Sequence, residues 1–247
     1  MNKYFTIILT IILFTACQSA PEDYSNFEKA HLQGIIYDID NQPVSQVSIY
    51  LVQITPFEDD KEENAENKKE GPIERRQVSD IRGRFLFADL PKGEYKIEYS
   101  KEKYEKVQTK IVFERKTQIL YAKIISFNQL IQLSQNALEN RKKDIALEYI
   151  NRAEVLDASS PLLQYLKAVY LYNILDYEGA IDILENLKKE GFSQPHINLF
   201  LSDLYELKQD DMNAIINLKE YLKSRFDPDA EQRLIGLQEK LDENNTD

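Results

Sequence analysis

The sequence predicts a two-domain protein, an all-β sandwich followed by an all-α solenoid of helical repeats. Two observations predict this fold class. Between residues 31 and 124, apolar and polar residues alternate and turn signals separate the segments, as in short strands. Between residues 126 and 228, small and apolar residues recur every 34 positions, a period typical of stacked helix pairs. With 247 residues, the chain can bury a core in each part without disulfides.

Residues 1–16 are typical of a secretory signal peptide. Lys3 precedes an apolar run from Tyr4 to Ala16, and this run is shorter than the roughly 20 residues that cross a bilayer. The segment Phe14-Thr15-Ala16-Cys17 resembles the lipobox of bacterial lipoproteins, although that family usually has Leu in place of Phe14. The resemblance implies that Cys17 carries lipid, including palmitate, and begins the mature protein. The alternative is an ordinary signal peptide with an incidental cysteine.

Composition and the residues after the cysteine limit the partners and the location. Cys17 is the only cysteine, so a lipidated chain forms no intrachain disulfide. The net charge of −11 becomes −12 when Lys3 leaves with the signal peptide, and this charge disfavours nucleic acid. Residues 17–30 are polar and are expected to form a tether. In known lipoproteins, Asp after the cysteine retains some proteins in the inner membrane. Gln18 therefore favours the outer membrane, facing the periplasm of a bacterial envelope.

Residues 31–124 are expected to form the β-sandwich. Turn clusters fall at Asp38–Pro43, Asp80–Gly83 and Leu90–Tyr95. The apolar residues that define the expected strands are Leu32, Ile35 and Tyr37; Val47, Ile49 and Leu51; Val78; Phe85 and Phe87; Tyr95 to Tyr99; Tyr104, Val107, Ile111 and Phe113; and Ile119, Tyr121 and Ile124.

The turns of this segment carry a family resemblance. The residues concerned are Gly34, the turn from Asp40 to Val44, Asp80 with Gly83-Arg84-Phe85, and the run from Leu90 to Tyr95. They resemble the carboxypeptidase regulatory-like (transthyretin-like) domain over residues 32–124. The resemblance implies a transthyretin-like or immunoglobulin-like sandwich that serves as an accessory or adhesive module and carries no catalysis of its own.

An acidic insertion is expected within the sandwich at residues 56–74. Its charge run, Glu58 to Glu70, holds seven acidic residues and three lysines. A calcium loop needs ligands at fixed spacing and usually a glycine, and no glycine lies between Glu58 and Lys69. The run is therefore interpreted as a solvated insertion between two strands.

Residues 126–228 are expected to hold three repeats of two helices each. Close helix crossing needs small side chains, and small residues recur at the required interval. These are Ser134, Ala168 and Ser202 on the first helices, and Ala146, Ala180 and Ala214 on the second. The positions resemble the small eighth residue and the alanine at position 20 of tetratricopeptide repeats, although the family's aromatic fourth position holds Leu130, Gln164 and Asn198 here. Residues 229–247 are expected to form a closing helix and tail, and the sandwich is expected to cap the first repeat, because only Ser126 separates the two parts.

The resemblance to tetratricopeptide repeats implies an inner groove lined by first-helix residues. The candidates are Ile131, Gln135 and Leu138; Leu162, Tyr165, Val169 and Tyr172; and His196, Leu199, Asp203 and Glu206, with Asn128, Glu139, Asn173 and Leu207 beside them. None is Lys or Arg, which disfavours the carboxylate clamp of chaperone-binding relatives. The apolar stripe suits an apolar protein segment, and the acidic residues favour a basic flank on that partner. The alternative is that Tyr165 and Tyr172 are covered by the sandwich or by a second copy.

No catalytic pattern stands out. The two histidines, His31 and His196, fall in different predicted domains, and no zinc-protease, nucleophile-elbow or phosphate-loop motif occurs. The plentiful carboxylates are compatible with a glycosidase, but no polar cluster supports one.

We therefore expect no catalysis, metal or cofactor. We expect a lipid-anchored envelope scaffold that binds a protein partner through its repeats. The alternative is a glycan-binding or adhesive lipoprotein that uses the sandwich, which the absence of tryptophan disfavours.

Overall fold

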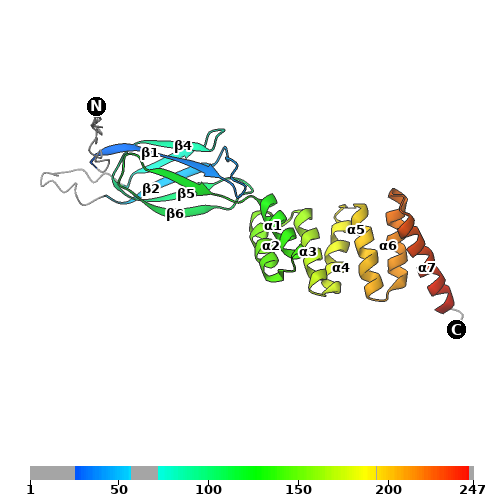
Figure 1. Cartoon of the computed structure of the whole chain (residues 1–247). Helices are drawn as coiled ribbons and strands as arrows, with labels where there is room; N and C mark the ends of the chain where they lie inside the picture. Colours follow the sequence, from blue (N-terminus) through cyan, green and yellow to red (C-terminus); the bar gives the residue numbers. More distant parts are fainter. Residues whose placement is uncertain (1–25, 57–71, 193, 245–247) are drawn as a thin grey trace, which may run out of the picture.

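The computed structural model describes residues 26–56, 72–192 and 194–244. Along these residues, strands β1 to β7 precede helices α1 to α7, and the two parts follow one another along an elongated molecule (Figure 1). The predicted fold class, an all-β sandwich followed by an all-α solenoid, is therefore confirmed. The signal segment, Cys17 and the acidic run Glu58 to Glu70 lie outside the described residues.

The sandwich consists of two sheets. One has the strand order β4-β1-β7, in which β7 runs parallel to β1, and the other has the order β3-β2-β5-β6 with antiparallel pairs throughout. The strands are β1 (Lys29–Tyr37), β2 (Ser48–Pro56), β3 (Glu74–Val78), β4 (Arg84–Pro91), β5 (Gly93–Ser100), β6 (Val107–Phe113) and β7 (Ile119–Lys123).

Alternation along the strands places one apolar set between the sheets. Leu32 and Ile36 of β1 are fully buried against the other sheet's Ile49, Leu51 and Ile97. A glycine in β1 leaves room for an aromatic ring from the neighbouring strand. A Cβ at Gly34 would lie 2.4 Å from Phe85 Cζ and 2.7 Å from the carbonyl oxygen of Leu120. Glycine is therefore a packing requirement at this position.

The sandwich begins earlier than expected. Phe27 is buried, with its ring centroid 5.3 Å from that of Phe113, and β1 begins at Lys29. Residues 27–30 therefore belong to the sandwich and not to the tether expected over 17–30. A single buried aromatic in a polar stretch produces no periodicity, so the residue pattern does not predict it. Two other boundaries also differ from the prediction. The acidic insertion was expected to extend to residue 74, but Glu74 already pairs with Val52. A turn was expected over Leu90–Tyr95, but only Lys92 separates β4 from β5.

The helices form three consecutive pairs with a seventh helix packed on the last pair. All six small residues of the 34-residue period are fully buried. At the crossing of the first pair, Ser134 Oγ donates to the carbonyl of Ala146 at 3.2 Å, so the small residues of the two helices meet. The helices are α1 (Phe127–Glu139), α2 (Lys143–Asp157), α3 (Pro161–Asn173), α4 (Tyr177–Lys189), α5 (Pro195–Leu207), α6 (Asp211–Ser224) and α7 (Pro228–Asn244).

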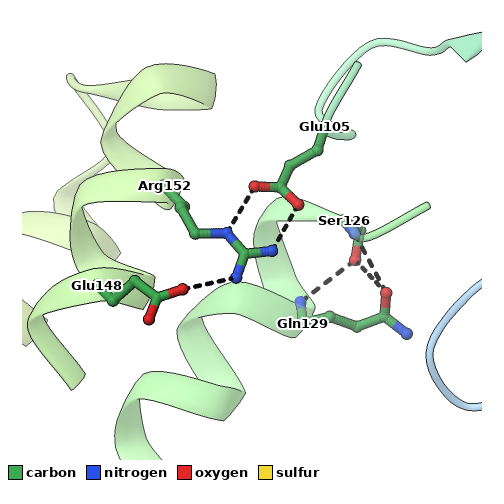
Figure 2. Close-up of polar contacts among 5 residues, drawn as sticks. All are labelled: Glu105, Ser126, Gln129, Glu148 and Arg152. Carbon is green, nitrogen blue, oxygen red and sulfur yellow. Dashed lines mark hydrogen bonds and ion pairs between the residues drawn. The ribbon is translucent and has the colours of Figure 1, made fainter. Parts of the chain in front are cut away.

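The turn between the two parts is tied to both of them (Figure 2). Ser126 caps α1 in a capping box with Gln129, whose amide donates to Asp40 of the sandwich at 2.7 Å. Arg152 of α2 donates two hydrogen bonds of 2.8 Å to Glu105, in the loop between β5 and β6. The sandwich thus contacts both helices of the first repeat, as expected of a cap.

Candidate binding groove

The first helices of the repeats, α1, α3 and α5, carry the predicted groove residues. Tyr165 and Tyr172 lie two turns apart on α3, and both pack edge-on against Phe200 of α5, at centroid distances of 6.0 and 5.6 Å. His196 meets the Tyr165 ring at 4.9 Å and 90°. The structure therefore joins the second and third repeats through an aromatic cluster. Phe200 was missed from the sequence, although its position one turn after His196 could have indicated it.

A hollow of about 410 Å³ lies between α1 and α3. It brings together groove residues of the first and second repeats, with Leu138, Leu166 and Val169 as its apolar part. The polar lining consists of Gln135, Glu139, Tyr165 and Asn173. Gln135, Leu138, Tyr165 and Val169 were all predicted groove residues, with Glu139 and Asn173 beside them, so the structure places these six around one concavity.

The predicted groove residues differ in their access to solvent. Leu162 and Tyr172 are 45% and 39% exposed, so both side chains are accessible to solvent. Ile131 is buried in the core of the first repeat, and Leu199 packs against the cluster formed by α6 and α7. Ile131 therefore does not line an open groove as predicted, and Leu199 is partly covered by the last helices. Leu162 and Tyr172 expose part of their side chains to solvent.

The acidic residues of the third repeat already have a partner within the chain. Arg233 of α7 donates to Asp203 at 2.6 Å and also to Glu206. Burial lowers the pKa of Arg233, but the bonds to these two carboxylates outweigh it and raise that pKa above its usual value. Asp203 and Glu206 are therefore already paired within the chain, and a basic flank on the partner stays a prediction. Arg233 lies beyond the repeats, where the 34-residue period gives no signal.

The groove remains negative around its aromatic residues. Burial raises the pKa of Tyr165, and the negative charge of Asp203 raises it further. Glu139 adds an exposed carboxylate at the hollow. Within the described ranges, no group of His, Cys, Asp and Glu side chains is arranged to hold a metal ion. In the same ranges, no helix combines the length and the apolar character needed to span a bilayer.

Comparisons with known proteins give partial likenesses. No protein-family model matches the sequence, and no curated protein matches it. Among solved structures, the yeast Sti1 TPR2AB domain in complex with an Hsp90 peptide is similar over 48% of this chain and 48% of that chain, with a TM-score of 0.43 and 17% identity. A Bacteroides fragilis TPR repeat protein is similar over 45% of this chain and 51% of that one, with a TM-score of 0.36 and 20% identity.

A third likeness covers a smaller share of this chain. A putative carbohydrate-binding protein from Pseudomonas aeruginosa is similar over 39% of this chain and 88% of that chain, with a TM-score of 0.28 and 13% identity. This chain spans about half the length of the two repeat structures described above. The class assigned here, a β-sandwich joined to tetratricopeptide-like helix pairs, rests on the geometry of the chain itself.

Proposed function

We propose that this protein is a non-catalytic scaffold that binds an apolar segment of another protein in the inner groove of its repeats. The observation that carries this proposal is the 410 Å³ hollow between α1 and α3, which has an apolar floor. Leu162 and Tyr172 add exposed apolar side chains on the same helix α3. A concavity lined by apolar residues with a few polar groups is typical of a binding site. An amphipathic helix or an extended strand presents side chains at spacings that a groove between helices accepts.

We further propose that the scaffold is held by lipid on Cys17 in a bacterial envelope, at the outer membrane and facing the periplasm. The apolar run Tyr4 to Ala16 and the lipobox-like segment ending in Cys17 support this proposal. Labelling cells with an alkyne analogue of palmitate and separating their membranes tests it. Cys17→Ser should lose the label and leave the membrane fraction. A labelled or still membrane-bound Cys17→Ser protein would contradict lipid anchoring.

A second candidate function is glycan binding or adhesion by the sandwich. Tyr121 of β7 is 67% exposed, and its ring stacks on Tyr37 at 6.4 Å and 9°. Leu86 and Ile119 are also exposed, and both pair with Gln33 of β1, so they lie in one row across the three-stranded sheet. Exposed aromatic and apolar residues on a flat sheet face favour a ligand at the sandwich.

Crosslinking and pull-down from the protein's own cells distinguishes the two candidates. The test variant is Tyr165→Ala with Tyr172→Ala, and Tyr121→Ala on the sandwich is the matched control. Circular dichroism must first show that each variant is folded. If one envelope protein is captured by the wild type and by Tyr121→Ala but lost with the double variant, the groove is the binding site. Capture that survives the double variant, or glycan recovered only when Tyr121 is present, supports the second candidate.

A further inference from the structure

The polar side chains around the hollow are free to bind a partner. In the part of the chain that the structure describes, the side chains of Gln135 and Glu139 form no hydrogen bond or ion pair. Asn173 donates only to the carbonyl of Val169 at 2.8 Å. An apolar floor with unused polar groups at its edge is the arrangement found in specific ligand sites.

The third repeat differs from this arrangement. Its two groove carboxylates, Asp203 and Glu206, are both bound by Arg233. Glu139 therefore remains as the unpaired groove carboxylate among the described residues of the candidate set. A cation of the partner gains more from an unpaired carboxylate than from one that already has a guanidinium partner.

The position of Glu139 also favours a cation from outside. It is the last residue of α1, at the negative end of the helix dipole, and the last turn of α1 has no basic residue. Residues 141–143 are basic and follow after Asn140, but they form no ion pair with Glu139. A Lys or Arg that approached Glu139 would relieve this unfavourable charge placement.

We propose that the partner is a segment with a large apolar side chain and a Lys or Arg within about one helical turn of it. The apolar side chain fills the hollow between α1 and α3, and the basic residue pairs with Glu139. This inference rests on the proposed groove function and places the basic residue of the bound segment at the first repeat. A segment that ends in a free carboxylate is not the preferred ligand. Arg233, the cation that lies beside the third repeat's groove residues, already binds two carboxylates of the chain itself.

A peptide selection tests this inference with a defined probe. A phage library of random 12-residue peptides is selected against the full-length protein in detergent micelles, and one enriched peptide is synthesised with a fluorescent label. We expect enriched sequences to combine a large apolar residue with Lys or Arg three or four positions away. Fluorescence polarisation should show about five-fold weaker binding for Glu139→Lys, and binding to the wild type should weaken with added salt.

Two further variants separate charge from shape. Glu190 caps the C-terminal end of α4 and is also exposed, so Glu190→Lys is a matched control that should bind normally. Gln135 is exposed at the hollow, so Gln135→Trp fills the cavity without removing a core residue and should abolish binding. Peptides that need Tyr172 but tolerate both Glu139→Lys and Gln135→Trp would overturn this inference alone. Failure of every selected peptide to depend on Tyr165 and Tyr172 would overturn the groove function itself.

Discussion

The joint between the sandwich and the first repeat permits a quantitative test. Arg152 and Glu105 form two hydrogen bonds of 2.8 Å, and their side chains are only 31% and 24% exposed (Figure 2). Hydrogen bonding of the Arg152 guanidinium to the Glu105 carboxylate, which accepts both bonds, is the main cause of the raised pKa of Arg152. The perturbation is a double-mutant cycle built from Arg152→Gln, Glu105→Gln and the double variant.

The expected coupling energy follows from the geometry and burial of the pair. Exposed ion pairs contribute about 0.2–1 kcal/mol, whereas breaking a fully buried pair costs about 3–5 kcal/mol. The Arg152–Glu105 pair is bidentate and mostly shielded, so we expect about 1–2 kcal/mol. The same arginine supplies an internal reference, because it also contacts Glu148 at 3.3 Å and Glu148 is 64% exposed. That second pair should contribute about 0.3–0.5 kcal/mol.

Urea unfolding followed by circular dichroism measures these couplings. The ellipticity at the helix band reports the repeats, and hydrogen exchange of the amides in β2 and β5 reports the sandwich. Arg152→Gln should also separate the two transitions, because it removes the bidentate bond that joins the parts. A coupling with Glu105 no larger than the coupling with Glu148, or parent transitions that are already separate, would refute this account of the joint.

Three other changes test the packing and the ionisation. Gly34→Ala should destabilise the sandwich by about 2–3 kcal/mol in urea, because the new methyl meets both Phe85 and the carbonyl of Leu120; a loss below about 0.5 kcal/mol would contradict this. Asn198→Leu should raise stability by about 1 kcal/mol, because Asn198 Oδ1 is buried without a hydrogen-bond partner among the described residues; a lower melting temperature would show that the amide is needed. Burial raises the pKa of Tyr95 to about 12, so the unfolded chain loses this proton first. The free energy of unfolding should therefore be unaffected by this group below pH 10 and should fall between pH 10 and pH 12, by at most about 1.4 kcal/mol per pH unit. The fall should be less steep in Tyr95→Phe. Urea midpoints at several pH values measure both slopes.

The fold class was predictable because it depends on residue spacing. Close helix crossings need small residues at a fixed interval, so Ala146, Ala180 and Ala214 mark the repeats in any reading of the sequence, and the structure buries all three. Strand alternation is equally local, since a half-buried strand must place every second side chain in the core. Where a single residue makes a single long-range contact, as Phe27 does with Phe113, no period exists to reveal it.

The candidate groove was predictable only in part, for a related reason. Resemblance to known repeats indicated which positions of α1, α3 and α5 share a face, and six of these residues line one hollow. The charge of the groove depends on a residue outside the repeats. Arg233 belongs to α7, and its pairing with Asp203 and Glu206 follows from how that helix packs on the last pair. Tertiary packing of an unrepeated element therefore decides which carboxylates are free.

The two ends of the repeat array are stabilised in different ways, and this bears on the groove. At one end, the sandwich binds α1 through Gln129 and Asp40, and binds α2 through Arg152 and Glu105. At the other end, α7 closes the array and its Arg233 occupies the acidic part of the third repeat. A repeat array needs both of its exposed ends covered, because each helix pair stacks only on its neighbours. Because α7 uses groove residues for this closure, the partner surface is displaced toward the first and second repeats. The proposed ligand is therefore expected on α1 and α3, away from the carboxylates that Arg233 already binds.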